Sequence, residues 1–346
     1  MKLCELWLED KDNSVICTAC TRRCRIGAGR TGTCMTRKNE GGKLYSLTYG
    51  HISSIALDPI EKKPLFHFFP GSHVYSIGGW GCNFGCGMCQ NYEIAHIVPG
   101  LRDEDAVPPE KLVSDALAKN ADGMAFTYNE PAIWPEFVRD VFKLVKKHNL
   151  YTVLVTNGSS TRESIDYYGP YCDAYRVDIK GMTDITLGRI GIRGIDPSEI
   201  LEGTVWARDR WGMHVECVTN IIPTVNDSES ELRAIATWIR DNLGPKVPWH
   251  VTRFYPALRF RHLMPTDLPS LEMAEKIGKQ VGLSYVYIGN VHTQRGENTY
   301  CPRCQALIIE REGYKIKQNL SAMGRCTRCG ELLGIVTSDT RESYRS

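Results

Sequence analysis

The chain has 346 residues, of which 42% are hydrophobic and 24% charged, and its net charge at pH 7 is +2. This composition is that of an ordinary globular protein, and the length suits a core domain with one or two small additions. So small a net charge excludes a strong general attraction to nucleic acid or anionic membranes. No apolar run approaches the ~18 residues of a membrane span and no signal segment follows Met1, so we expect a cytoplasmic protein without a membrane partner.

Eleven of the fourteen cysteines are grouped in short motifs, which is typical of metal binding in a reducing cytosol. The first group is the C-x-x-C-x-x-x-C motif of Cys17, Cys20 and Cys24, followed by Cys34. Four thiolates with glycines between them can close a tetrahedral structural zinc site, and the leading C-x-x-C favours zinc. A second iron–sulfur cluster also takes four cysteines and is the open alternative.

Short strands are expected at 43–58, and strand-like runs then alternate with amphipathic helical stretches. The strands are expected at 74–77, 124–128, 152–156, 174–179, 214–222, 250–255 and 285–288, and the helices at 109–119, 135–148, 228–242 and 270–281. We expect Asp227 or Ser228 to cap the third helix and Ser270 the fourth. Such alternation implies an α/β fold with a parallel sheet, of the partial (β/α)6 barrel type, whose chemistry gathers at the carboxyl ends of the strands.

The first of these barrel strands leads into a loop that carries Cys82, Cys86 and Cys89 with C-x-x-x-C-x-x-C spacing. Iron–sulfur clusters are held by cysteine thiolates, and a cubane normally takes four. Three thiolates on one loop can therefore hold three irons and leave the fourth open to a substrate or cofactor. A closed zinc site or a disulfide framework explains an isolated triplet less well.

Polar motifs follow the other barrel strands. They are 128–131 (Tyr-Asn-Glu-Pro), 156–158 (Thr-Asn-Gly), 178–180 (Asp-Ile-Lys), 222–227 and 253–256. Taken singly, each is more often a turn, a cap or a solvated charge than a catalytic group. Their recurrence at successive strand ends, behind a cysteine triplet, indicates a binding site.

The last part of the chain carries two C-x-x-C knuckles, formed by Cys301 with Cys304 and by Cys326 with Cys329. This pattern predicts a zinc ribbon, and zinc is favoured over a rubredoxin-type iron because four thiolates suit a closed tetrahedral site. We therefore divide the chain into an N-terminal cysteine-rich module (1–73), a partial barrel (74–292) and a C-terminal zinc-ribbon or rubredoxin-like module (293–346).

The cysteine loop resembles the signature of the radical S-adenosylmethionine (SAM) superfamily. Over nearly its whole length the chain is similar to the radical SAM proteins of the AmmeMemoRadiSam system, which in turn resemble pyruvate formate-lyase activating enzymes. The residues that carry this resemblance are Cys17–Cys34, Asp58–His67, the loop with Gln90-Asn91, Tyr128–Pro131 and the closing knuckles. The resemblance implies a [4Fe–4S] cluster on the loop cysteines and reductive cleavage of SAM to a 5′-deoxyadenosyl radical. That radical abstracts hydrogen from a substrate, which we expect to be a protein or peptide.

The resemblance also assigns positions that contact SAM. Asn129 and Glu130 take the place of the superfamily's Gly-Gly-Glu motif, which holds the methionine amino group. Asp178 and Lys180 match the activating enzymes' Asp-x-Lys motif near the ribose and the carboxylate. These roles suit the chemistry, because a carboxylate accepts from an ammonium or from hydroxyls.

Two further positions come from the same resemblance. Thr156 and Asn157 match another turn that contacts SAM. Met88 stands where an aromatic residue usually precedes the last cysteine, so only a backbone contact with adenine is expected there.

The implied partners are a reducing electron donor such as ferredoxin or flavodoxin, and Memo-like and AMMECR-type proteins. One alternative is a radical SAM enzyme that modifies RNA, since zinc ribbons often serve nucleic acid. Two arginine clusters, at 22–25 and 303–328, are better explained as solvated surface, so nucleic acid is not an expected partner. The other alternative is a metal-dependent scaffold without SAM chemistry, against which the intact triplet, Glu130 and Asp178 argue.

Overall fold

The protein is described by a computed structural model that covers residues 1–291, 296–321 and 323–340. Its centre is an eight-stranded sheet with the strand order β14-β13-β12-β11-β10-β9-β8-β7. These strands are β7 (Ser54–Pro59), β8 (His73–Gly78), β9 (Gly123–Phe126), β10 (Tyr151–Thr156), β11 (Ala174–Asp178), β12 (His214–Ile221), β13 (Trp249–Arg253) and β14 (Val286–Gly289). Strands β8 to β14 run parallel in chain order, and β7 pairs antiparallel with β8. The predicted α/β fold with a parallel sheet is confirmed.

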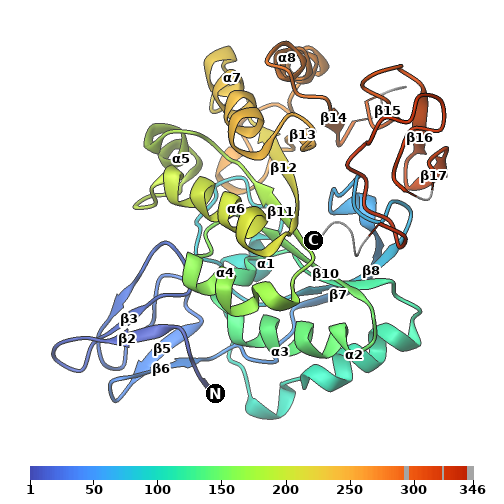
Figure 1. The fold of residues 1–346 in the computed structure, drawn as a ribbon. Helices are drawn as coiled ribbons and strands as arrows, with labels where there is room; N and C mark the ends of the chain where they lie inside the picture. The colour runs from blue at the N-terminus through green and yellow to red at the C-terminus, as the bar shows by residue number, and fades with distance from the viewer. Residues whose placement is uncertain (292–295, 322, 341–346) are drawn as a thin grey trace.

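Helices connect the parallel strands and lie around the outside of the sheet (Figure 1). They are α1 (Tyr92–Ala95), α2 (Pro109–Ala118), α3 (Pro135–Lys146), α4 (Arg162–Tyr168), α5 (Asp184–Ile190), α6 (Pro197–Trp211), α7 (Glu229–Trp238) and α8 (Leu268–Gln280). The four predicted helices are present with shifted ends, and α7 continues into a π-helical turn at Ile239–Leu243. Helices α1, α4, α5 and α6 were not predicted.

The caps of the last two barrel helices differ in how well they were predicted. Ser228 caps α7, because its hydroxyl accepts from the backbone N–H of Glu231 at 3.3 Å. The prediction that Ser270 caps α8 is wrong. Asp267 is the cap, and its carboxylate accepts from the backbone N–H of Ser270 at 3.0 Å. A proline in the first turn lets the helix begin earlier than the apolar pattern indicated.

The main hydrophobic core fills the space between the sheet and its helices. Phe126 on β9 packs against Trp134, Phe137 and Phe142, with ring centroids 5.3, 6.0 and 5.4 Å away. All four side chains are buried, and each such burial contributes about 1.5–3 kcal/mol. Strand β9 is buried along its whole length, as expected for a parallel strand covered on both faces.

The beginning of the chain forms two small sheets, one with the order β1-β6-β5 and the other β2-β3-β4. Their strands are β1 (Lys2–Leu3), β2 (Trp7–Glu9), β3 (Val15–Cys17), β4 (Arg25–Ile26), β5 (Arg37–Glu40) and β6 (Lys43–Ser46). Arg37 joins this region to α3 through two hydrogen bonds to Glu136, at 2.9 and 2.8 Å, and both side chains are 1% exposed. The large sheet already includes β7, which lies before the predicted boundary at residue 73.

The end of the described chain forms a third small sheet, made of β15 (Thr299–Tyr300), β16 (Leu307–Glu312) and β17 (Lys315–Gln318). Figure 1 shows it on the side of the molecule away from the first module. The predicted boundary at residues 292 and 293 lies outside the described residues.

Residues 60–72 cross the interior of the sheet near the amino ends of its strands. The backbone N–H groups of Phe66 and His67 donate to Glu216 on β12 at 3.0 and 2.8 Å. The imidazole of His67 also bonds the hydroxyl of Tyr287 on β14 at 2.7 Å. Val336 then adds backbone bonds to this segment, at 2.7 Å to the His67 carbonyl and 2.8 Å from the Phe69 N–H. We call residues 60–72 the plug, because they fill the barrel at this end.

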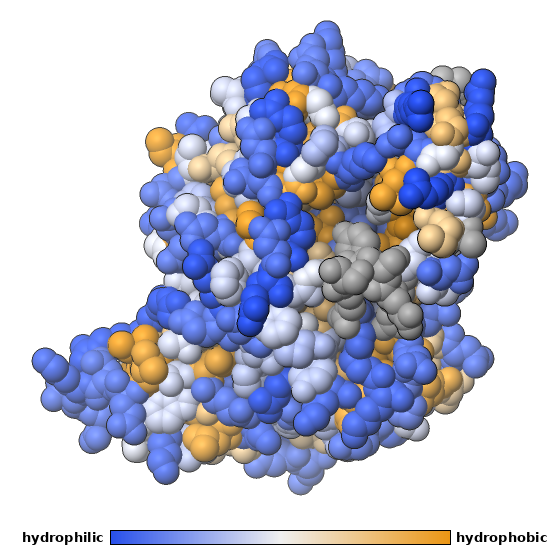
Figure 2. All heavy atoms as spheres, in the orientation of Figure 1, coloured by the Kyte–Doolittle hydropathy of each residue, from blue (hydrophilic) through white to orange (hydrophobic). Residues whose placement is uncertain are grey.

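The surface is mainly hydrophilic on the face shown in Figure 2, with apolar residues scattered over it. Among the described helices, none is both long and apolar enough to cross a membrane.

Candidate active site

A cavity of about 450 Å³ opens at the carboxyl ends of the parallel strands. The loop after β8 brings Cys82, Cys86 and Cys89 into its wall. The other predicted SAM positions line the same cavity: Met88, Asn129, Glu130, Thr156, Asn157, Asp178 and Lys180. We call this cavity the chamber. Segments that are far apart in the sequence therefore meet in one place, as the strand-end pattern indicated.

The cysteine loop is anchored at both ends. Gly81 has a φ of +82°, and a Cβ there would lie 2.7 Å from the Cys34 carbonyl oxygen, so only glycine fits. Further along, the backbone N–H of Gly87 donates to the Ile190 carbonyl at 2.8 Å, and its carbonyl accepts from the Arg259 N–H at 3.0 Å. These contacts hold the three thiols on one wall of the chamber.

The thiols lie in a low-dielectric environment with a cation nearby. Burial raises the pKa of the Cys86 thiol to about 11, and the ammonium of Lys180 acts in the opposite direction. Metals bind the thiolate, so metal binding must release the thiol protons. The donor set fits a [4Fe–4S] cluster with one open iron, because the loop supplies three thiols and Lys180 offsets the negative charge.

Glu130 is 1% exposed and already accepts three hydrogen bonds. They come from the Ala132 N–H at 3.0 Å, the Thr156 hydroxyl at 2.7 Å and the Asn157 N–H at 2.7 Å. Burial nevertheless raises the pKa of Glu130 to about 7. A carboxylate has about four acceptor positions, so one is left for an ammonium. Glu130 thus also ties the end of β9 to the end of β10.

At three of the predicted SAM positions, Asn129, Thr156 and Asn157, the side chain hydrogen-bonds other residues of the protein. Asn129 accepts from the Gly79 N–H at 3.1 Å and donates to the Gly81 carbonyl at 2.9 Å. Asn157 donates to the side chain of Asn83 at 3.0 Å, and the Thr156 hydroxyl donates to Glu130. The contacts of Asn129 and Asn157 therefore orient the cysteine loop, and that of Thr156 supports Glu130.

Asp178 sits between two cations. It accepts from Arg176 at 2.7 Å and from Lys180 at 3.2 Å. Burial alone would raise the pKa of Asp178, but the two cations outweigh it and hold that pKa below its usual range. Arg176 was not predicted as a site residue. The period of two along β11 places it on the same face as Asp178, which is the signal that could have found it.

A second group in the chamber wall was also missed. Asp58 accepts from the Lys63 ammonium at 2.6 Å and from the Tyr128 hydroxyl at 2.8 Å. The Lys63 nitrogen lies 5.1 Å from the centre of the Tyr128 ring, and burial lowers the pKa of Lys63 to about 8. Lys63 and Tyr128 both line the chamber. The sequence offered only the run Asp58–His67 and no indication of this long-range contact.

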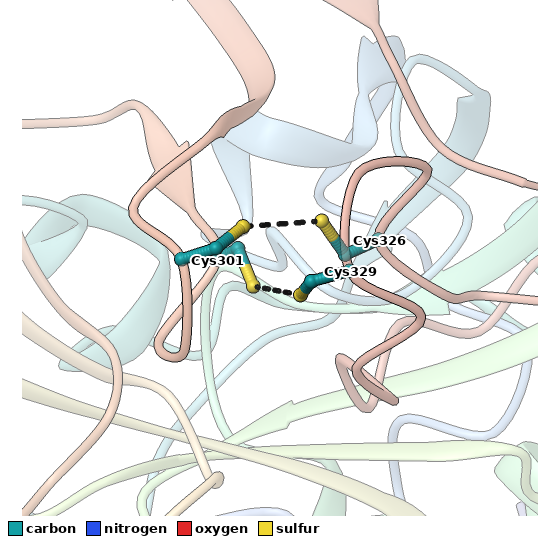
Figure 3. A group of neighbouring side chains, drawn as sticks. Cys301, Cys326 and Cys329 are labelled. Atoms are coloured by element: carbon teal, nitrogen blue, oxygen red, sulfur yellow. Dashed lines mark hydrogen bonds between the residues drawn. The ribbon is translucent and has the colours of Figure 1, made fainter.

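The C-terminal cysteines converge on one point from two facing loops (Figure 3). The sulfurs of Cys301 and Cys329 lie 3.5 Å apart, those of Cys304 and Cys326 lie 3.6 Å apart, and all four fall within 4.8 Å of one another. Zinc–sulfur bonds are about 2.3 Å long in a tetrahedron, so these separations suit a single metal ion. This group could bind a metal, and zinc itself stays a prediction.

The chain belongs to the radical SAM superfamily, whose pattern matches residues 77–239. This class uses a [4Fe–4S] cluster and SAM. An uncharacterized protein of Methanocaldococcus jannaschii, MJ0808, is 39% identical over 327 residues, which are 94% of this chain and 96% of that protein. The pyruvate formate-lyase-activating enzyme of Clostridium pasteurianum is 27% identical over 176 residues, or 46% of this chain and 67% of that enzyme.

A solved structure extends the comparison to the fold. A radical SAM methyltransferase from Sphaerobacter thermophilus superposes with a TM-score of 0.50 at 15% identity, over 66% of this chain and 69% of that chain. At this identity the likeness shows a common fold and says nothing of a common reaction.

Proposed function

We propose that this radical SAM enzyme belongs to the AmmeMemoRadiSam group and removes a hydrogen atom from a protein or peptide, as activating enzymes do. The observation that carries the proposal is the chamber, where three loop thiols face the groups suited to SAM and where space and polar wall remain beyond them. The similarity to the activating enzyme of Clostridium pasteurianum supports the same reaction class.

Within this proposal each side chain has a defined task. Cys82, Cys86 and Cys89 hold the cluster, which when bound supplies the electron that cleaves SAM to a 5′-deoxyadenosyl radical. Glu130 accepts from the methionine ammonium with its remaining acceptor position. Asp178 accepts from the ribose hydroxyls while Lys180 attracts the methionine carboxylate. The cysteine loop and the buried strand ends would shield the reacting atoms on their side of the chamber and so limit side reactions of the radical.

The mouth of the chamber favours a large substrate. Tyr314, between β16 and β17, lines the chamber and is 57% exposed, and Tyr255 lines it from the end of β13 and is 47% exposed. The C-terminal module therefore forms part of the chamber wall. A polypeptide segment can contact this module and the barrel together, which gives the module a role in docking.

The proposed partners follow from the proposed group and reaction. A low-potential donor such as ferredoxin or flavodoxin would supply the electron in a reducing cytoplasm. Memo-like and AMMECR-type proteins are the first substrates to test, because the group is defined by its association with them.

The test is anaerobic reconstitution with SAM, a reductant and deuterated candidate proteins, followed by mass spectrometry of 5′-deoxyadenosine. We expect deuterium in 5′-deoxyadenosine with the true partner and none with the unlabelled partner or the Cys82→Ala/Cys86→Ala/Cys89→Ala variant. Cleavage of SAM without deuterium transfer from any protein would overturn the substrate proposal. Deuterium transfer from labelled RNA would replace it with RNA modification.

A further inference from the structure

Four cysteines of the first module line one small cavity beside the loop that carries the catalytic thiols. They are Cys17, Cys20, Cys24 and Cys34, and the apolar side chains of Ala19, Ile26, Ala132 and Ile133 complete most of the wall. We infer that these four cysteines hold a second [4Fe–4S] cluster, and not the zinc ion that their C-x-x-C spacing favoured. This inference concerns the first module and does not depend on the proposed substrate.

The separation of the sulfurs is the first argument. A single zinc ion draws four sulfurs close together, whereas a cubane distributes its thiolates over different irons and so holds them further apart. The C-terminal set meets the first condition, with all its sulfurs within 4.8 Å of one another. Among the described residues, no three cysteines of residues 17–34 and no such trio from the catalytic loop come this close. The first module therefore resembles the cluster loop and differs from the single-ion site.

The second argument is an unused donor in the wall. Arg37 lines the cavity and is 1% exposed, and Glu136 occupies both of its terminal nitrogens. Its Nε has no hydrogen-bond partner among the described residues. A buried N–H without a partner is destabilising, and the thiolates or sulfides of a cluster would accept from it.

The sulfurs already have hydroxyl neighbours. Thr36 donates from its hydroxyl to the Cys34 sulfur at 3.2 Å, and the Thr33 hydroxyl lies 3.6 Å from the Cys24 sulfur. Hydrogen bonds to sulfur and an apolar surround are the means by which proteins set the potential of iron–sulfur clusters. The wall thus combines four thiols, sulfur-directed donors and little polar surface.

Asn83 connects this cavity to the catalytic loop. It directly follows Cys82 and lines the cavity together with Cys20. Its amide also accepts from Asn157 at 3.0 Å, and the guanidinium of Arg22 donates to its backbone carbonyl. A cluster in the first module would therefore share a neighbour with the catalytic cluster and with a SAM position.

The test uses the full chain with Cys82→Ala/Cys86→Ala/Cys89→Ala, which removes the catalytic cluster. After anaerobic reconstitution with iron and sulfide we expect about four irons and about four acid-labile sulfides per chain to remain, with an electron paramagnetic resonance signal after reduction. Adding Cys20→Ala and Cys24→Ala should remove that sulfide and the signal. Sulfide rather than iron decides the result, since a single iron in the C-terminal knuckles carries none.

The matched control is Cys4→Ala in the same background. Cys4 is buried in the same module but does not line the cavity, so sulfide content should stay unchanged. If the variants do not fold, the reconstituted unmodified chain gives the answer through about eight sulfides rather than about four. No sulfide in the triple variant, or about four in the unmodified chain, with zinc bound in addition to the C-terminal ion, would overturn the inference.

Discussion

The C-terminal cysteines and the catalytic-loop cysteines use the same ligand atom for different ends. The C-terminal sulfurs all lie within 4.8 Å of one another, whereas no such trio forms on the loop that carries Cys82, Cys86 and Cys89. Four converging sulfurs can fill all four coordination positions of one tetrahedral ion. A dispersed set of three can hold a larger cluster and present one metal atom to the chamber. The comparison teaches that the distances between sulfurs distinguish a single-ion site from a cluster site where ligand type cannot.

The largest expected effect is on the dispersed set. Cys82→Ala/Cys86→Ala/Cys89→Ala should abolish SAM cleavage completely, because no iron remains to bind SAM and deliver an electron. The measurement is 5′-deoxyadenosine production after reduction. Cys172→Ala, at a buried cysteine outside the chamber, should retain cleavage. SAM cleavage that persists in the triple variant would remove the basis of the comparison.

The next effect concerns the converging set. Cys304→Ser/Cys329→Ser should lose one metal per chain by elemental analysis while the catalytic cluster stays. Structural metal binding supplies folding free energy on the order of 10 kcal/mol, so residues 296–340 should become sensitive to protease. An unchanged metal count would show that the four sulfurs bind no ion.

A smaller effect is expected at the acceptors beside the dispersed set. Asp178→Asn should weaken SAM binding by about ten- to a hundredfold, because a charge-assisted hydrogen bond is worth about 1.5–3 kcal/mol. Calorimetry on the reconstituted protein measures it, with the cluster spectrum as a check. Asp166→Asn is the control, since Asp166 bonds the indoles of Trp206 and Trp211 and does not line the chamber. Equal weakening in both variants would mean that Asp178 does not hold SAM.

The smallest expected effect is a pH dependence of the free energy of unfolding that comes from Glu130, beside the dispersed set. Burial raises the pKa of Glu130 from 4.5 to about 7. The folded chain therefore binds more protons than the unfolded chain between these values, and the contribution of Glu130 to stability falls as pH rises through 7. Relative to Glu130→Gln, the cluster-free protein should lose about 1–3 kcal/mol between pH 5 and pH 8 in urea unfolding. Parallel curves would mean that Glu130 keeps its ordinary pKa.

Much of the barrel could be predicted because its strands are buried on both faces and give continuous apolar runs. β11 and β12 begin at the predicted residues, Ala174 and His214. Helix α6 was missed although Asp196 caps it and Pro197 opens it, since its apolar residues form no clear stripe. The capping residues of α6 predict its start better than the spacing of its apolar residues does.

The candidate site also has a part that the sequence predicts and a part that it does not. The cysteine triplet and the strand-end motifs could be placed because parallel strands bring their carboxyl ends to one edge. The group of Asp58, Lys63 and Tyr128 could not, because it depends on β7 pairing with β8 beside β9. The side-chain bonds of Asn129 and Asn157 to the loop were equally invisible, since a short motif shows residue types and not their partners.

The plug has a consequence for folding during synthesis, because it contacts a residue near the end of the chain. Val336 completes the backbone bonds of His67 and Phe69, so one of the earliest parts of the barrel waits for one of the latest. Domains generally fold from the N-terminus during synthesis. The barrel therefore leaves the ribosome before the plug has made its backbone bonds to Val336. Until residue 336 emerges, Phe68 and the apolar residues around it lack Val336 as a packing neighbour and stay more exposed to solvent.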